Sequence, residues 1–302
     1  TQRAGCYVST AGCFVVVARV GAFASSRRWC YVRSVRRASL TLSFVLLACG
    51  GPRLPLPAAG EPACTVSDDA VACAPQISRI GGRDVYWQQP IVSAPADGYP
   101  VVLVFQGSFF GPPLTWNRVP RDTAFGGYQQ ARLQALLLDQ GFIVIAPSAE
   151  GIAWQTNTSP DFANSSDKRF IDTLLEEVRG GTFGTADASR LYATGISSGG
   201  YMTSRMAAEW PGTFRALAIA SASWATCGGA VCALPEALPP GHPPTLLMHG
   251  RGDVAVPLFT AQAYLDALVA QGFEAELAVD DDRGHEWLPD APERVAAWFA
   301  AH

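Results

Sequence analysis

The residue in this sequence best suited to nucleophilic chemistry is a serine flanked by glycines. Gly195-Ile196-Ser197-Ser198-Gly199 follows residues 191–194, which read as the end of a buried strand, and residues 201–210 read as a helix. A G-x-S-x-G sequence between a strand and a helix bends the chain sharply and presents the serine hydroxyl at the sheet edge. The same short pattern also occurs by chance in glycine-rich loops, so the assignment depends on partners elsewhere in the chain.

Two later residues have the right chemistry and position to activate this serine. A serine nucleophile needs a base that takes its proton and an acid that orients the base. Asp253 lies in an H-G-x-x-D-x-x-V-P segment directly after a predicted strand, 245–249, and His285 lies in a loop before the last predicted helix, 292–301. The order Ser, Asp, His is that of the α/β-hydrolases. We therefore predict a catalytic triad of Ser197, Asp253 and His285.

Other histidines and aspartates are weaker candidates for the base and the acid. His242 stands among prolines and reads as a surface loop residue, His249 ends a strand and reads as packed or as a residue that supports the catalytic ones, and His302 ends the chain. Three aspartates lie shortly before His285, but residues so close in sequence rarely have the geometry to orient the ring. They read as a solvated acidic turn. These aspartates are Asp280, Asp281 and Asp282.

The oxyanion of the reaction requires two backbone N–H donors. One is expected from the residue after the nucleophile, Ser198. The other is expected from the loop after an early apolar strand, 99–106, where Ser108 is the first choice and Phe109 the second. Gln106 stands at the point where many esterases have histidine. This chemistry needs no metal and no cofactor.

Aromatic residues follow the predicted carboxyl ends of several strands, where ligands bind in open α/β sheets. Together they predict a broad apolar acyl site, or a surface that adsorbs a hydrophobic substrate. They are Phe109, Phe110, Trp116, Trp154, Trp224 and Trp287. Only about twenty residues separate the predicted strands 214–222 and 245–249, which is too short for a large helical lid.

The element pattern predicts an α/β fold with a mostly parallel, doubly wound sheet and helices on both faces. Residues 61–75 read as a loop pinned by a pair of cysteines, and a β-hairpin, 76–80 with 84–89, follows it. Further strands are expected at 99–106, 142–147, 191–194, 214–222, 245–249 and 275–279, and helices at 129–140, 167–179, 201–210, 260–271 and 292–301. The pattern places a single catalytic domain over residues 61–302.

The first 60 residues read as an export segment rather than as part of the fold. Arginines at 33–37 precede an apolar run, 39–48, and a Pro/Ala/Gly stretch ends near Gly60. The run is about half the length of a membrane span. Leu46-Leu47-Ala48-Cys49 is similar to a bacterial lipobox, in which Cys49 would be lipidated; ordinary cleavage after Gly50 is the alternative. Residues 1 to about 31 read as sequence translated ahead of the true start.

Charge and cysteine content agree with an exported enzyme. The net charge is −4 and the body of the chain has no basic stripe, so nucleic acid is not an expected partner. Four cysteines lie in the body, and in an exported protein they predict two disulfides. Sequence alone allows three pairings, of which the local ones are favoured: Cys64 with Cys73 and Cys227 with Cys232. Membrane contact is expected only through a lipid at Cys49.

The combined motifs resemble the extracellular medium-chain-length polyhydroxyalkanoate depolymerases. The resemblance rests on Gly195-Ile196-Ser197-Ser198-Gly199-Gly200-Tyr201-Met202, on Asp253, 56 residues after the serine, and on His285, 32 residues later. It covers about residues 62–302. It implies a single-domain secreted bacterial enzyme, with the same triad, that cleaves polyesters of 3-hydroxyalkanoates with longer side chains. A lipid anchor would depart from that pattern.

The sequence therefore predicts a secreted serine esterase acting on a hydrophobic polyester. The nearest alternative is a feruloyl or acetyl-xylan type of carbohydrate esterase, followed by hydrolases of short-chain polyhydroxyalkanoates or aromatic polyesters. A dipeptidyl-peptidase-like enzyme would normally carry a propeller domain or an acidic pair for the substrate amine, and neither is evident in the sequence. A binding module on an inactive hydrolase fold conflicts with three filled triad positions.

Overall fold

An eight-stranded sheet forms the centre of the region that the computed structural model describes, residues 63–156 and 161–302. In spatial order its strands are β11 (Ala275–Asp280), β10 (Thr245–Gly250), β9 (Phe214–Ala220), β8 (Ala186–Ile196), β5 (Tyr99–Phe105), β7 (Ile143–Pro147), β4 (Arg83–Gln88) and β3 (Gln76–Ile80). The neighbours from β11 to β7 are parallel. β4 and β3 form the predicted N-terminal hairpin and pair antiparallel. The predicted mostly parallel, doubly wound sheet is confirmed.

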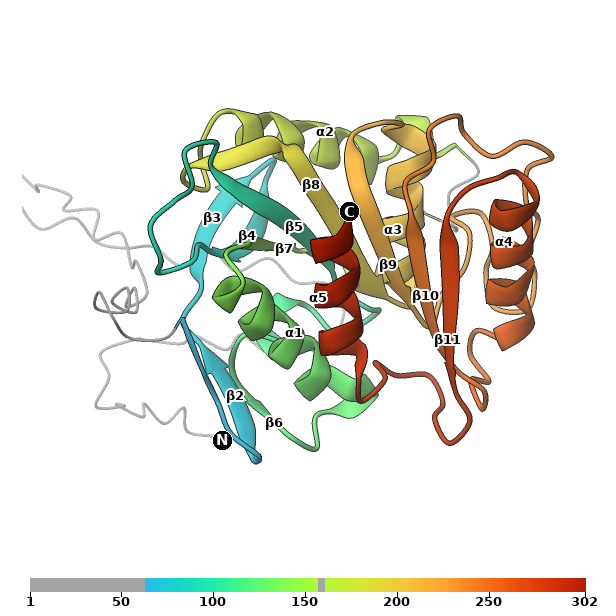
Figure 1. The fold of residues 1–302 in the computed structure, drawn as a ribbon, viewed down its shortest axis with the longest axis horizontal. Helices are drawn as coiled ribbons and strands as arrows, with labels where there is room; N and C mark the ends of the chain where they lie inside the picture. The colour runs from blue at the N-terminus through green and yellow to red at the C-terminus, as the bar shows by residue number, and fades with distance from the viewer. Residues whose placement is uncertain (1–62, 157–160) are drawn as a thin grey trace, which may run out of the picture. The chain divides into compact units, whose positions relative to one another are not determined.

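Helices cover both faces of this sheet (Figure 1). α1 (Gly127–Asp139) and α5 (Ala291–Ala301) pack on one face, and α2 (Ser166–Arg179), α3 (Ser198–Glu209) and α4 (Leu258–Ala270) pack on the other. The alternation along β5 explains why both faces are covered, because successive strand residues point to opposite sides. Val102 and Val104 join the core under α1 and α5, whereas Leu103 joins the core under α2 and α3.

A second, three-stranded sheet corrects the expectation of a plain loop over residues 61–75. β1 (Cys64–Val66) and β2 (Ala70–Cys73) form an antiparallel hairpin, and β6 (Asn117–Pro120) pairs with β2. Cys64 lies opposite Cys73 in the register, and the two form a disulfide. β6 has the sequence Asn-Arg-Val-Pro with only Val119 buried, so no hydrophobic pattern marks it as a strand.

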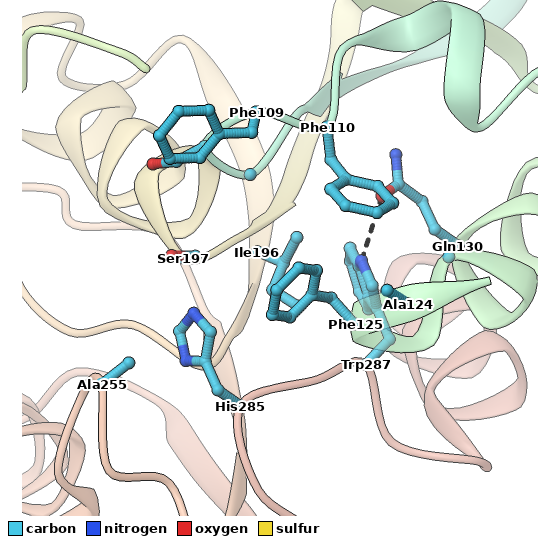
Figure 2. Close-up of a pocket in the computed structure, with 13 residues that line it drawn as sticks. Phe109, Phe110, Ala124, Phe125, Gln130, Ile196, Ser197, Ala255, His285 and Trp287 are labelled. Atoms are coloured by element: carbon cyan, nitrogen blue, oxygen red, sulfur yellow. Dashed lines mark hydrogen bonds between the residues drawn. The ribbon is translucent and has the colours of Figure 1, made fainter. Parts of the chain in front are cut away.

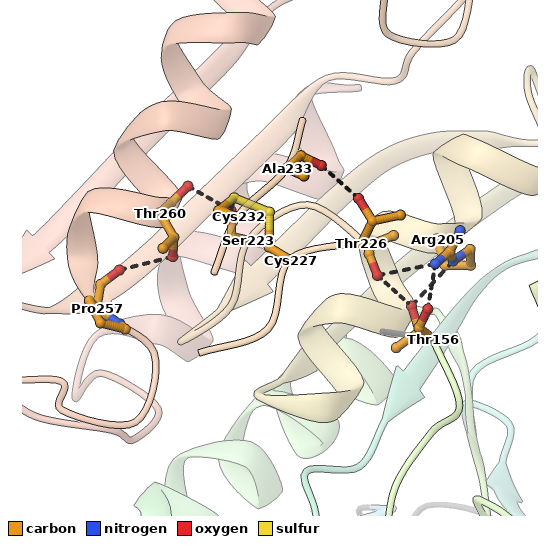
Figure 3. Close-up of a disulfide and its surroundings, with 10 residues drawn as sticks. Thr156, Arg205, Ser223, Thr226, Cys227, Cys232, Ala233, Pro257 and Thr260 are labelled. Atoms are coloured by element: carbon orange, nitrogen blue, oxygen red, sulfur yellow. Dashed lines mark hydrogen bonds between the residues drawn. A yellow bond between two sulfur atoms is a disulfide. The ribbon is translucent and has the colours of Figure 1, made fainter. Parts of the chain in front are cut away.

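The segment between β9 and β10, residues 221–244, contains turns and one isolated bridge in place of a helical lid. A disulfide joins Cys227 to Cys232 within it (Figure 3). Ser223 Oγ donates to the carbonyl of Thr260 in α4 at 2.6 Å, and Thr226 Oγ1 donates to the carbonyl of Ala233 at 2.9 Å. The bond to Thr260 ties the segment to α4, and the bond to Ala233 closes the segment on itself. No helix of this segment, whose residues are all described, covers the carboxyl edge of the central strands.

The predicted export signal and Cys49 lie outside the described residues. Within the described part of the chain, no helix combines the length and the apolar character needed to cross a membrane.

Candidate active site

Ser197 occupies a strained turn between β8 and α3. Its backbone has φ 56° and ψ −121°, a region that costs a non-glycine residue about 1–3 kcal/mol. Hydrogen bonds hold the turn on both sides: the Ser197 N–H donates to the Ala220 carbonyl at 3.0 Å, and the Ser197 carbonyl accepts from the Tyr201 N–H at 2.9 Å. α3 begins at Ser198, three residues before the start predicted from its apolar pattern.

The neighbouring glycines are needed because backbone approaches backbone here. A Cβ on Gly199 would lie 2.1 Å from the Phe105 carbonyl oxygen, and a Cβ on Gly195 would lie 2.5 Å from the Gly199 carbonyl oxygen. Neither glycine has a positive φ. Their role is therefore space: they allow the first turn of α3 to start directly against the ends of β5 and β8, while Ser197 itself takes the strained conformation.

Asp253 and His285 meet at the carboxyl edge of the sheet. His285 Nδ1 lies 2.8 Å from Asp253 Oδ2, and the Asp253 side chain is fully buried. The N–H groups of Ala255 and Val256 donate to Asp253 Oδ1 at 2.9 and 2.8 Å. Burial alone would raise the pKa of Asp253, but hydrogen bonds from two histidines and from the Val256 N–H outweigh it, so the pKa lies well below its usual range. The carboxyl group is therefore ionised at neutral pH.

The second histidine beside this carboxylate is His249, at the end of β10. Its side chain is fully buried, and its Nε2 lies 2.7 Å from the Val256 carbonyl and 3.4 Å from Asp253 Oδ2. A carbonyl only accepts, so His249 Nε2 carries the hydrogen. Its Nδ1 has no hydrogen-bond partner among the described residues. His249 thus braces the loop of Asp253, a contact that its position in the sequence left open.

The alternative acids and bases lie elsewhere. Asp281 forms an exposed ion pair with Arg251, and Asp280 accepts from the backbone N–H of Asp282, as expected for a solvated acidic turn. His242 corrects the prediction of a surface loop residue. It is 5% exposed, packs among aromatic rings and bonds the Tyr264 hydroxyl at 2.7 Å, and burial lowers its pKa to about 4.

Two backbone N–H groups remain available beside Ser197. Neither Ser198 nor Ser108 donates its N–H to another group in the described part of the chain. The N–H of Phe109, the second choice, donates to the Ile152 carbonyl at 2.8 Å and is therefore occupied. A Cβ on Gly107 would lie 3.8 Å from the Cβ of Ser197, so the loop that carries Ser108 passes directly beside the serine. The geometry favours Ser108 over Phe109 as the second donor.

Ser197 and His285 open into one apolar pocket of about 260 Å³. A ring nitrogen of His285 lies on the side of Ser197, and the pocket extends from this pair towards Trp287 and Gln130 (Figure 2). The Trp287 indole N–H donates to Gln130 Oε1 at 3.1 Å, so a satisfied polar pair closes the far end. The pocket is lined by Gly107, Ser108, Phe109, Phe110, Ala124, Phe125, Gly127, Gln130, Ile196, Ser197, Ala255, His285 and Trp287.

Phe125 is a pocket residue that the sequence pattern did not reveal. Its ring packs edge-on against Phe110, with centroids 5.2 Å apart, and lies 6.2 Å from the His285 ring. Its backbone has φ 56° and its side chain is 51% exposed. The Phe125 carbonyl accepts from the Trp287 N–H at 3.1 Å, which joins the loop before α1 to the loop of His285. No regular periodicity marks this loop, so only the fold brings it to the site.

Three of the six aromatic residues predicted to contact substrate line the pocket: Phe109, Phe110 and Trp287. The other three correct the prediction, because they do not line this pocket and their side chains are buried in the hydrophobic core: Trp116, Trp154 and Trp224. Trp154 instead supports the turn at Ser197 and Ser198. Its backbone N–H donates to Ser198 Oγ at 2.8 Å, and its indole N–H donates to the Gln106 carbonyl at 3.2 Å. Following a strand in sequence did not distinguish packing from substrate contact.

Comparison with known proteins also indicates a hydrolytic enzyme. Residues 129–226 match the prolyl oligopeptidase family (Peptidase_S9). Feruloyl esterase B from Thermothelomyces thermophilus is 34% identical over 110 residues, which cover 32% of this chain and 34% of that enzyme. The solved structure of acetyl xylan esterase from Aspergillus awamori superposes with a TM-score of 0.55 at 18% identity, covering 76% of this chain and 99% of that one. The structural match shows a shared α/β-hydrolase fold.

A bacterial relative covers far more of the sequence. Poly(3-hydroxyoctanoate) depolymerase from Pseudomonas fluorescens is 47% identical over 228 residues, which are 74% of this chain and 81% of that enzyme. Such identity over most of both chains shows common membership rather than a shared fold alone. This chain therefore belongs to the family of poly(3-hydroxyoctanoate) depolymerase, within the α/β-hydrolases, and is a serine-type carboxylic ester hydrolase.

Proposed function

We propose that the chain is a secreted depolymerase of medium-chain-length polyhydroxyalkanoate that works through an acyl-enzyme on Ser197. The observation that carries the proposal is the apolar pocket that holds both Ser197 and His285. A polyester with alkyl side chains offers hydrophobic groups to such a pocket and an ester carbonyl to the serine. The relative from Pseudomonas fluorescens, whose name states the same substrate class, supports the proposal.

In the proposed reaction, His285 accepts the proton of Ser197 as Ser197 Oγ attacks the ester carbonyl carbon. Asp253, bonded to His285 Nδ1, orients the ring and stabilises the imidazolium that forms. The N–H groups of Ser198 and Ser108 bind the oxyanion. The carbonyl-to-alkoxy bond then breaks, and His285 gives its proton to the leaving alkoxide.

The second half of the reaction repeats these roles with water. His285 takes a proton from a water molecule, whose oxygen attacks the acyl carbon and forms a second oxyanion in the same place. Collapse of this intermediate breaks the bond to Ser197 Oγ, which recovers its proton from His285. The products are a chain end with a free carboxylate and one with a free hydroxyl.

Export is part of the proposal. Two disulfides are typical of proteins that work in an oxidising compartment, and a polymer too large to enter a cell must be cleaved outside it. The export segment before residue 60 would deliver the enzyme there, either free or held by a lipid on Cys49. Mass spectrometry of the mature N-terminus from a bacterial host distinguishes the two: a diacylglycerol-modified Cys49 supports the anchor, and an unmodified later start supports release.

A carbohydrate esterase for feruloyl or acetyl groups is the second candidate, because the feruloyl esterase B segment matches at 34% identity. Clearing of agar that contains emulsified poly(3-hydroxyoctanoate), poly(3-hydroxybutyrate) or feruloylated xylan separates the candidates. We expect clearing on poly(3-hydroxyoctanoate) by the wild-type protein and none by Ser197→Ala of equal folded content. Release of ferulate from xylan without clearing of polyester would favour the carbohydrate esterase.

A further inference from the structure

A second hollow borders the catalytic pocket and shares one wall with it. It has a volume of about 300 Å³, and its lining includes Gln106, Phe109, Pro112, Pro113 and Ile152. Phe109 is the only residue that lines both cavities. Figure 2 shows Phe109 near Ser197, at the opposite end of the pocket from Gln130 and Trp287. Ser197 therefore lies at the end of the pocket where Phe109, the residue shared with the second hollow, is found.

Phe109 forms the wall between the two cavities, and its backbone conformation is energetically unfavourable. Phe109 is 69% exposed and has φ 66°, although a bulky side chain disfavours the left-handed region. Its N–H donates to the Ile152 carbonyl at 2.8 Å, which ties the wall to the far side of the second hollow. An exposed, strained phenylalanine contributes little to packing, and such residues cluster at binding sites.

The lining of the second hollow suits an ester with an alkyl group. Ile152, Pro112 and Pro113 supply apolar surface, and the Ile152 side chain is 57% exposed. The Gln106 amide supplies polar atoms to the lining: its Oε1 accepts from the Ala149 N–H at 3.4 Å, and a Cβ on Gly111 would lie 3.5 Å from this oxygen and 3.9 Å from the amide nitrogen. An amide NH₂ among apolar groups can donate to an ester carbonyl.

We propose that this hollow is a second substrate subsite, which binds the repeat unit next to the ester under attack. The inference rests on the proposed function, since it assumes that Ser197 cleaves an ester oligomer. Repeat units on the two sides of the scissile ester would then occupy the pocket of Trp287 and the hollow of Ile152, with the backbone of the substrate passing Phe109. A monomeric ester reaches only the first cavity, so the second hollow acts on oligomers alone.

Ile152→Asp tests the subsite, because it places a charge in the hollow on a half-exposed side chain outside the catalytic pocket. Leu114→Asp is the matched control, since Leu114 is a 51% exposed aliphatic residue nearby that lines neither cavity. The substrates are methyl 3-hydroxyoctanoate, which has no large group on the alkoxy side of its ester, and a methyl-capped trimer of 3-hydroxyoctanoate. For Ile152→Asp we expect kcat/KM to fall about tenfold on the trimer, a loss of about 1.4 kcal/mol, and to stay within twofold of the wild type on the monomer.

The control and the catalytic variant separate the two proposals. Leu114→Asp is expected to match the wild type on both substrates, and Ser197→Ala to lose both activities. Equal trimer rates for Ile152→Asp and Leu114→Asp would overturn the subsite and leave the proposed function standing. A trimer that Ser197→Ala still cleaves would overturn the proposed function itself.

Discussion

Ser197, the proposed nucleophile, has an unfavourable backbone conformation. The pattern Gly195-Ile196-Ser197-Ser198-Gly199 predicted the sharp turn, and the structure assigns its strain to the serine rather than to the glycines. The strain implies that the residue at 197 opposes stability in the folded state. A serine retained under such conditions agrees with a role in chemistry.

The strain at Ser197 predicts a difference between two inactive variants. Ser197→Gly relieves the backbone and Ser197→Ala does not, so we expect the glycine variant to be more stable by about 1 kcal/mol. For a chain of this size that is roughly 2–4 °C in Tm, measured by calorimetry. Both variants should lack esterase activity. An alanine variant as stable as the glycine variant would show that position 197 is not strained.

His249 should affect how the free energy of unfolding depends on pH, because it contacts Asp253. Since the pKa of Asp253 is lower in the folded than in the unfolded state, its contribution to stability is present above the unfolded pKa of about 4 and is lost as pH falls below that value. His249→Leu removes a donor, so the folded pKa rises and the loss between about pH 5 and pH 2 becomes smaller. Denaturant titrations at pH 3 to 7 measure this slope.

The same variant also leaves the Val256 carbonyl unpaired and buried, so at pH 7 it should lose about 1–3 kcal/mol of unfolding free energy. His249→Gln is the matched variant, because its amide can restore the donor. We expect the glutamine to recover most of the stability and of the pH slope. If leucine and glutamine behave alike, His249 serves packing only, and the bracing of Asp253 does not hold.

At the scale of elements, the regular strands and helices followed from periodicity, whereas short and irregular pieces did not. The apolar run of β5 and the amphipathic face of α2 were predicted closely, because both bury continuous hydrophobic surface. β6 and the loop of Phe125 were not predicted, because their few buried side chains follow neither the helix nor the strand periodicity. The candidate site is built from both kinds: Ser197, Asp253 and His285 lie beside predicted elements, and part of the pocket wall comes from the unpredicted loop.

The junction of β5, β8 and α3 leaves no room for a side chain at Gly199. Gly199→Ala would place a methyl group 2.1 Å from the Phe105 carbonyl oxygen, so we expect a loss of about 3 kcal/mol or more, together with loss of esterase activity. Gly111→Ala is the control, because its Cβ would meet its nearest neighbour at 3.5 Å and its φ is −61°. Thermal unfolding of both variants measures the difference. A tolerated Gly199→Ala would contradict the close approach.

For the molecule as a whole, exposed apolar side chains around the pocket suit the insoluble polymer that is the proposed substrate. Phe109, Phe125 and Val254, which precedes the pocket residue Ala255, are 69%, 51% and 93% exposed. The sequence predicted an aromatic rim there, but three of its six predicted members do not line the pocket, and a fourth, Trp287, lines it while almost fully buried. Burial is decided by the packing of distant segments, which a single sequence does not display.

The exposed side chains of Phe109, Phe125 and Val254 predict that the protein adsorbs to the polymer independently of catalysis. Ser197→Ala should bind a poly(3-hydroxyoctanoate) film, and adding Phe125→Ser should weaken the binding several-fold, because an exposed aromatic ring loses its contact area with the polymer. Ile77→Ser in the same background is the control, since Ile77 is 57% exposed on the edge strand β3. Depletion of protein from solution over the film measures binding. Equal losses for the two double variants would show that the rim has no special part.

The central claim is that Ser197 is the nucleophile of an esterase, and covalent trapping tests it most directly. A fluorophosphonate reacts with an activated serine, and peptide mass spectrometry locates the adduct. We expect one label per chain, on Ser197, with loss of poly(3-hydroxyoctanoate) hydrolysis in proportion to labelling, and no label on folded His285→Ala. A label on another residue, or full hydrolysis by protein labelled completely at Ser197, would contradict the account.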